Sequence, residues 1–255
     1  FKIMYFDTRT NVTVFSLLAA ILLDLPQGGF LFSISWLANI FILGNVKRIS
    51  VKSPIRYFVR ISGYFLHLGI FAFMGYLTLG KTEYRNTITS VLFLIFILIL
   101  NIYREYNVLR FKLSDVSIAS MKVKYPKFRY ILLIYNYIGA AICEELYFRY
   151  LIIEIFSRYG VYTILLSAVY FVLFHYTTLW GNSFKKSDYM RQLLFGIVFA
   201  ALYFYSKNIF ITIIGHLCLN IPQVYLMIKL YHRDFINPNY YRNLLLKDDL
   251  DDLLI

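Results

Sequence analysis

A short apolar stretch of the chain, AICEELYFRYLI at 141–152, contains two carboxylates and one guanidinium. These groups belong to Glu144, Glu145 and Arg149, and the neighbouring residues are almost all apolar. An ionised side chain at the centre of a bilayer costs about 2.5–3.5 kcal/mol on insertion scales, so such residues are rare and mark functional sites. We therefore take this stretch as the first candidate for a site of chemistry.

Two further polar pairs lie in apolar runs of the second half of the chain. Phe171 precedes His175 by four residues at the end of SAVYFVLFH, and His216 precedes Asn220 by four residues in ITIIGHLCLNIP. Residues four apart on a helix share a face. The imidazole of His216 and the amide of Asn220 are therefore expected to face one direction, with Phe171 packed beneath the ring of His175.

Helix geometry separates the two adjacent glutamates. Neighbouring residues lie about 100° apart around an α-helix, so Glu144 and Glu145 address different points. Glu145 precedes Arg149 by four residues, the favourable order for an ion pair that neutralises both charges inside the protein. Glu144 is then unpaired, and a buried carboxylate of this kind is suited to act first as a general base and then as an acid. The rise per residue places these groups at roughly similar depths in the membrane. We therefore expect that one cavity is lined by Glu144, His175, His216 and Asn220.

The elements that must position these side chains are membrane helices. Of the 255 residues, 60% are hydrophobic and only 16% are charged, whereas soluble domains carry about 25% charged residues. A spanning helix needs about 20 apolar residues. The sequence therefore predicts an all-α fold, a polytopic membrane helical bundle of about eight transmembrane helices with an intramembrane catalytic cavity. The predicted helices cover 11–25, 29–46, 58–79, 88–103, 130–156, 161–179, 192–206 and 208–231.

Three regions follow from this pattern. Residues 1–129 are expected to hold the N-terminal membrane helices and a basic cytoplasmic linker at 104–129, and residues 130–231 the catalytic core. Residues 232–255 are expected to form a C-terminal tail that ends in LLLKDDLDDLLI. For this ending we favour a simple solvated end over a short amphipathic helix.

The positive charge predicts orientation and partners. The formal net charge is +12, and Lys and Arg cluster in alternate connections at 47–60, 104–129 and 181–191. The positive-inside rule places these connections and both termini in the cytoplasm, next to anionic lipid headgroups. No nucleic-acid recognition motif is present, so we exclude nucleic acid as a partner. Frequent Lys, Ile, Phe and Tyr are typical of AT-rich bacterial genomes, which predicts an integral protein of a bacterial cytoplasmic membrane.

Taken together, the three motifs resemble the signature of the CPBP family (CAAX proteases and bacteriocin-processing enzymes, also called Abi), a class of intramembrane proteases. That signature is EExxxR, then FxxxH, then HxxxN or HxxxD, each on a membrane helix. Here the motifs read EELYFR at 144–149, FVLFH at 171–175 and HLCLN at 216–220. The order and every core position agree, and the resemblance covers about 130–225.

The resemblance implies an intramembrane endopeptidase that hydrolyses a peptide bond of a membrane-associated peptide or protein. Glu144 and His175 would activate a water molecule, while His216 and Asn220 would donate hydrogen bonds to the tetrahedral oxyanion. The residue chemistry alone supports the same division, because a free carboxylate, an imidazole and two donors form a complete hydrolytic set. The supporting residues that hold and orient this set would be Glu145, Arg149 and Phe171.

A zinc site is the alternative to this mechanism. It would use Glu144, His175 and His216, a set of two imidazoles and one carboxylate. Zinc would occupy the carboxylate that is needed as the base, and the chain contains no HExxH motif. We therefore favour a glutamate mechanism with no metal or other cofactor, and zinc stays the alternative.

Two other classes of function remain open. The chain could be a non-proteolytic scaffold or a bacteriocin-immunity protein that keeps the motifs for folding. A transporter is less favoured, because the sequence has no repeated halves. If the chain is a protease, the resemblance implies roles in bacteriocin immunity, peptide maturation or signalling in a bacterium. In a eukaryote it would imply removal of the last three residues of a prenylated CAAX protein.

Overall fold

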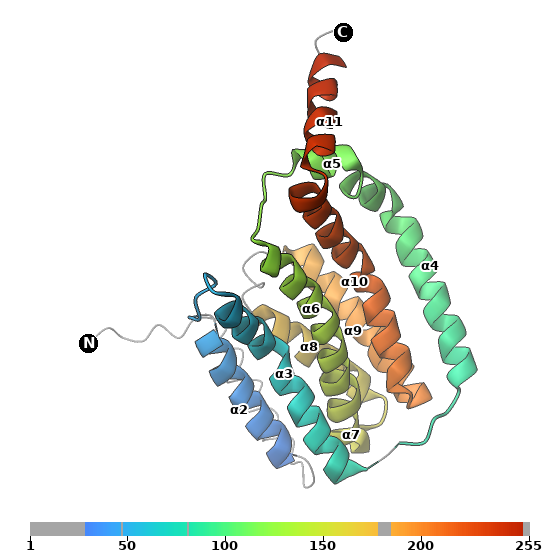
Figure 1. Cartoon of the computed structure of the whole chain (residues 1–255). Helices are drawn as coiled ribbons and strands as arrows, with labels where there is room; N and C mark the ends of the chain where they lie inside the picture. The colour runs from blue at the N-terminus through green and yellow to red at the C-terminus, as the bar shows by residue number, and fades with distance from the viewer. Residues whose placement is uncertain (1–28, 47, 81, 178–184, 252–255) are drawn as a thin grey trace.

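A computed structural model describes residues 29–46, 48–80, 82–177 and 185–251, with side chains up to Leu245. Within these ranges the chain forms helices and no strand, which confirms the all-α prediction (Figure 1). The α-helices are α2 (Gly29–Val46), α3 (Pro54–Leu79), α4 (Thr87–Lys112), α5 (Asp115–Ser120), α6 (Lys127–Glu144), α7 (Ile152–Ile155), α8 (Tyr162–Thr177), α9 (Lys186–Ser206), α10 (Ile209–Tyr231) and α11 (Pro238–Asp251). Two π-helical segments, η1 (Glu145–Leu151) and η4 (His232–Ile236), continue α6 and α10, and a 3₁₀ turn, η2 (Ser157–Tyr159), follows α7.

Five helical stretches are long and apolar enough to cross a membrane, so the chain is a helical membrane bundle. They are Gly29–Val46, Pro54–Leu79, Thr87–Lys112, Lys127–Ile155 and Ile209–Ile236. The predicted count of eight is not confirmed. The apolar part of α8 is shorter, Tyr162–His175, and α9 is not among the five. The first predicted helix, 11–25, lies outside the described residues.

Several boundaries differ from the sequence prediction; α9, for example, begins at Lys186 rather than at 192. The fourth span was expected to end at 103, but α4 continues to Lys112. The added residues include Arg104, Glu105 and Arg110, which are good helix formers, so the helix continues past the apolar run. The C-terminal tail is also helical, since α11 runs from Pro238 to Asp251. The tail is therefore helical through Asp251, while its amphipathic character stays a prediction.

The basic connections share one end of the bundle. Successive long helices run in opposite directions, so the start of α3, the end of α4 and the start of α9 lie toward the upper side of Figure 1. The short connections 82–86 and 207–208 lie at the opposite end, where the Arg85 amide donates to the Ser206 carbonyl. This arrangement agrees with the alternation of charge, while the assignment of the basic end to the cytoplasm stays a prediction.

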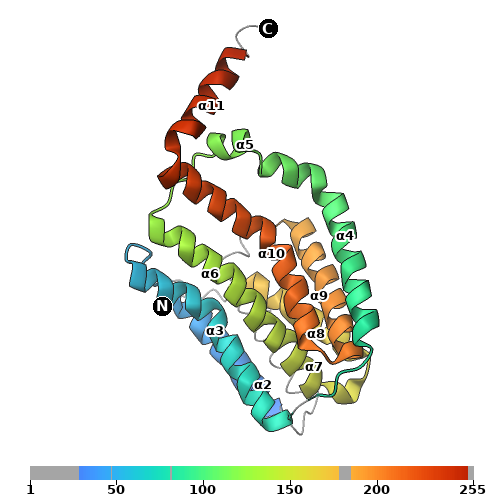
Figure 2. The same cartoon turned by 45° about the vertical axis from the view of Figure 1, so that its right-hand side comes forward.

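An aromatic core joins the N-terminal helices to the motif-bearing helices. Phe32 and Trp36 of α2 are fully buried and pack edge to face against Tyr170 of α8, with ring centroids 5.0 and 5.2 Å apart. Phe156, after α7, packs against the same Phe32 ring. The core thus combines residues from both sides of the boundary predicted at 129/130, and these ring contacts join α2 to the helix that carries His175. In Figure 2, α2 lies behind α3, against which it packs.

Close contact between α8 and α9 depends on Gly196. A Cβ atom at this position would lie 3.2 Å from the backbone Cα of Ala168. Small residues at such crossings let two membrane helices approach closely. The crossing sets the distance between α8, which carries two motif residues, and α9, which borders the same cavity.

We therefore predict that Gly196→Leu separates α8 from α9 and destabilises the protein. Overpacking of this kind costs about 1–3 kcal/mol, which should lower the melting temperature of the detergent-purified protein by several degrees. Gly44→Leu is the matched control, because a Cβ atom there meets nothing within 4 Å. Equal melting temperatures for the two variants would contradict this role of Gly196.

Candidate active site

A cavity of about 460 Å³ lies among α3, α4, α6, η1, α8, α9 and α10. All four predicted catalytic residues line it, and so do two of the three supporting residues. The predicted convergence of three separate motifs on one cavity is therefore confirmed as geometry. The lining residues that come from the motifs are Glu144, Arg149, Phe171, His175, His216 and Asn220.

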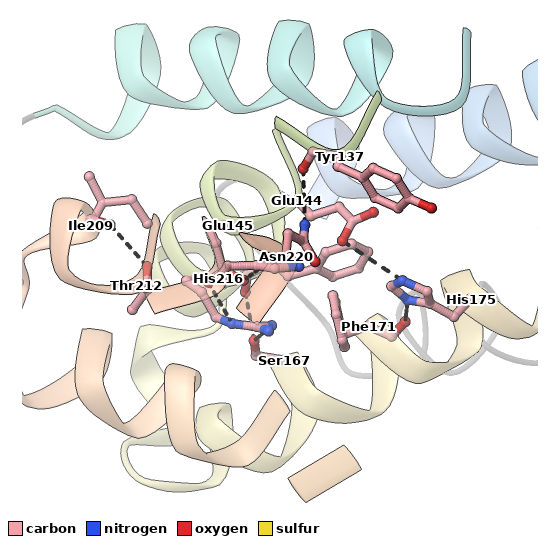
Figure 3. Close-up of polar contacts among 12 residues, drawn as sticks. Tyr137, Glu144, Glu145, Ser167, Phe171, His175, Ile209, Thr212, His216 and Asn220 are labelled. Atoms are coloured by element: carbon pink, nitrogen blue, oxygen red, sulfur yellow. Dashed lines mark hydrogen bonds and ion pairs between the residues drawn. The ribbon is translucent and has the colours of Figure 1, made fainter. Parts of the chain in front are cut away.

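Glu144 and His175 face each other across a short gap (Figure 3). Oε2 of Glu144 lies 3.8 Å from Nε2 of His175, which is too long for a direct hydrogen bond. The Glu144 side chain is 9% exposed and the His175 side chain 16% exposed, so both groups lie close to the cavity surface. On its other side, Nδ1 of His175 donates to the Phe171 carbonyl at 2.9 Å.

The Phe171 ring connects two functional groups. Its centroid lies 4.4 Å from that of the His175 ring, which confirms the predicted packing of this pair. The guanidinium carbon of Arg149 lies over the same ring, 4.6 Å from its centroid. A cation over an aromatic face is stabilised by the ring quadrupole. Phe171 therefore fixes the imidazole and the guanidinium relative to one another.

The predicted ion pair between Glu145 and Arg149 is present and fully buried. Oε2 of Glu145 lies 3.1 Å from Nε of Arg149, and both side chains are 0% exposed. The pair lies in the π-helix η1, whereas the sequence suggested a regular α-helix. Such π-helical turns occur frequently at functional sites. Ser167 of α8 supports this turn, because its hydroxyl donates to the Phe148 carbonyl at 2.6 Å and accepts from Arg149 at 3.3 Å.

His216 and Asn220 are both held by the helix that carries the glutamates. Nδ1 of His216 lies 2.9 Å from Oε1 of Glu145, a contact that sequence reasoning did not anticipate. Nδ2 of Asn220 donates to the Tyr137 carbonyl at 2.9 Å. Within the described residues, Nε2 of His216 and the second amide hydrogen of Asn220 have no other partner. These two groups remain for a molecule in the cavity that both residues line.

Several lining residues come from the N-terminal half, where the sequence suggested no site residues. Asn101 and Glu105 of α4 line the cavity, and Glu105 accepts a hydrogen bond from Arg191 of α9 at 3.1 Å. The available signal was their i,i+4 spacing at the end of the apolar run 88–103. Tyr137, Ser167 and Phe199, on the later helices, had no such signal, because none of them belongs to a polar pair and aromatic residues are common along these helices.

The donor atoms do not group as a metal site. Among the residues that the structure describes, no three or more His, Cys, Asp or Glu side chains lie close enough to hold a metal ion together. The suggested zinc set of Glu144, His175 and His216 does not form such a group in the described part of the chain, although the contact of Nδ1 of His216 with Glu145 leaves Nε2 open. We derive no step through a metal.

Comparison with known proteins finds a similarity over the motif-bearing segment of the chain. Residues 126–222 match the family model described as Rce1-like, type II CAAX prenyl endopeptidase Rce1-like. No curated protein and no solved structure gives a significant match. The matched range contains all three motifs. Residues 126–222 are thus similar to the Rce1-like type II CAAX prenyl endopeptidases, a protease family, which confirms the predicted resemblance to the CPBP proteases.

Proposed function

We propose that this protein is an intramembrane endopeptidase that hydrolyses a peptide bond of a membrane-associated peptide or protein. The observation that carries the proposal is the 3.8 Å gap between Glu144 and His175 in a cavity that His216 and Asn220 also line. A water-activating pair and two donor groups thus border a single space. This is the arrangement that hydrolysis of an amide requires.

The assignment of hydrogen-bond donors and acceptors supports a water molecule between Glu144 and His175. The Phe171 carbonyl can only accept, so Nδ1 of His175 carries the hydrogen and Nε2 of the neutral ring is an acceptor. An ionised Glu144 is also an acceptor. A water molecule in the gap can donate one hydrogen to each group and direct its lone pairs toward a substrate carbonyl. Glu144 then takes a proton as the water attacks, which is general-base catalysis.

His216 and Asn220 are the proposed oxyanion donors. Attack on the carbonyl moves negative charge onto its oxygen, and prepositioned donors in a water-poor site stabilise that charge strongly. Asn220 keeps one amide hydrogen for this purpose, because Tyr137 accepts the other. Glu144 finally returns its proton to the departing amine, so that one peptide and one water yield an acid and an amine.

Glu145, Arg149 and Phe171 are proposed to support the site rather than to react. Removing one partner of a buried ion pair costs about 3–5 kcal/mol, since the other charge is left uncompensated. The pair therefore holds η1 in place while Phe171 aligns His175. We propose no metal in this mechanism.

For the cellular setting, we propose that the basic end of the bundle faces the cytoplasm and contacts anionic headgroups. Substrates of CAAX type, roles in bacteriocin immunity or signalling, and a bacterial cytoplasmic membrane are parts of the same proposal. They rest on the family match and on composition.

Glu144→Gln and His175→Ala should each reduce cleavage of membrane peptides by about 10²–10⁴-fold, the range for loss of general-base catalysis. The measurement is the initial rate of peptide cleavage by purified protein in detergent or liposomes. Glu83→Gln, an exposed change in the connection between α3 and α4, is the control and should retain the wild-type rate. If both site variants keep full cellular function, a non-proteolytic scaffold is the better explanation.

Asn220→Ala should lower kcat by about 10²–10³-fold, the usual effect of removing one oxyanion donor. The Michaelis constant should change little, because the hydrogen bond forms fully only in the transition state. Steady-state kinetics on one peptide substrate gives both constants. A raised Michaelis constant with normal kcat would instead indicate that Asn220 binds the substrate.

Cleavage should continue after extended dialysis against a strong chelator. Metal analysis of the same sample, together with the rate before and after dialysis, provides the measurement. Loss of activity that returns on addition of zinc would overturn the glutamate mechanism in favour of the metal alternative.

A further inference from the structure

The two cavity histidines differ in what binds their Nδ1 atoms. Nδ1 of His175 faces a neutral carbonyl, that of Phe171, at 2.9 Å. Nδ1 of His216 faces a carboxylate, that of Glu145, also at 2.9 Å. Both partners accept hydrogen bonds only, so Nδ1 carries the hydrogen in each ring. The two rings nevertheless differ in how strongly their surroundings favour a second proton on Nε2.

This difference matters for the oxyanion role of His216. A neutral imidazole has one N–H group. If Nδ1 uses that hydrogen for Glu145, Nε2 of a neutral His216 presents a lone pair to the cavity. A lone pair repels an oxyanion. His216 can donate from Nε2 only when the ring is an imidazolium ion, with both nitrogens protonated.

The charges around His216 favour the imidazolium form. Glu145 forms an ion pair with Arg149, whose Nε lies 3.1 Å from the other carboxylate oxygen. With Glu144 ionised as the base, the two carboxylates and Arg149 sum to one negative charge. A protonated His216 brings this buried group to neutrality. Opposite charges within a few ångströms stabilise the charged form of an ionisable group.

Two aromatic rings also lie near His216. Its ring lies between those of Phe171 and Phe199, with centroids 6.3 and 6.2 Å away. Only 15% of the side chain is exposed, so little water screens its interaction with Glu145. No titratable group from these two aromatic neighbours competes for Nδ1. Burial by itself disfavours the charged ring, and the hydrogen bond and charge of Glu145 act against this effect.

We propose that Glu145 is a positioning residue that keeps His216 doubly protonated, so that Nε2 can donate to the oxyanion. Through Oε2 the same carboxylate anchors Arg149, and through Oε1 it holds His216. This inference rests on the proposed hydrolytic function. It assigns opposite states to the two histidines: a neutral His175 that accepts from water and a cationic His216 that donates.

The direct test is the protonation of the ring nitrogens, measured by NMR on histidine-labelled protein. The chain contains only four histidines, so the signals are few. Loss of one signal in His216→Gln assigns that residue. We expect two ring N–H groups for His216 at neutral pH in the wild type and one in Glu145→Gln, whose amide still accepts from Nδ1. One ring N–H group in the folded wild type overturns the proposal.

Kinetics provides the second test. Glu145→Gln should lower kcat by about 10²–10³-fold with little change in the Michaelis constant, because an oxyanion donor is lost. The activity of Glu145→Gln should also fall at a lower pH than the activity of the wild type, because His216 releases its proton more easily without the carboxylate. The charged groups that influence this titration are Glu144, Glu145 and Arg149. Glu145→Asp, which keeps the charge, should restore part of the rate.

A matched control separates charge from folding. Glu154 is a glutamate that also forms an ion pair, with Lys207 at 2.6 Å, but it does not line the cavity and has no contact with His216 among the described residues. Glu154→Gln should leave the pH profile and the His216 signals unchanged. Identical pH profiles for the wild type and a folded Glu145→Gln overturn the proposal. The cleavage rate of Glu144→Gln tests hydrolysis itself. A wild-type protein that shows a doubly protonated His216 but no cleavage would contradict the proposed function and leave the proposal for Glu145 intact.

Discussion

The Glu145 carboxylate is the group on which the arrangement of the cavity depends. It is 0% exposed and contacts two cationic or ionisable side chains, Arg149 within its own helix and His216 from α10. A buried charge without partners costs several kcal/mol. The carboxylate therefore requires both contacts, and these requirements fix the rotation of η1 and the approach of α10. Once they are fixed, Glu144 is turned toward His175 and the cavity.

Packing around the contacts of Glu145 makes the site rigid. Phe171 lies against both Arg149 and His175, so the two basic groups share one aromatic contact. Ser167 binds both η1 and Arg149 from α8. The Phe32–Trp36–Tyr170 cluster then braces α8 against α2. Helices without a motif therefore contribute to the site through packing, which explains why the cavity lining extends into the N-terminal half.

Much of the fold and site could be predicted because membranes restrict the possibilities. Long apolar runs must be helices in a bilayer, since unpaired backbone groups are too costly there. This constraint predicted α2, α3, α4, α6 and α10. The i,i+4 spacing predicted the Glu145–Arg149 pair and the Phe171–His175 contact, both of which the structure contains. Boundaries were less certain, because charged residues after Tyr103 continue the helix without any apolar signal.

The sequence by itself determined the helical membrane class, the residues able to do chemistry and their grouping into three motifs, because composition and spacing along one helix are local properties. Only the tertiary structure decided which group each polar atom binds. The contact of His216 with Glu145, the anchoring of Asn220 by Tyr137 and the π-helical form of 145–151 all depend on neighbouring helices. Contacts between residues 71 or 83 positions apart leave no periodic trace in a sequence, so the different partners of the two histidines emerge only when the helices pack.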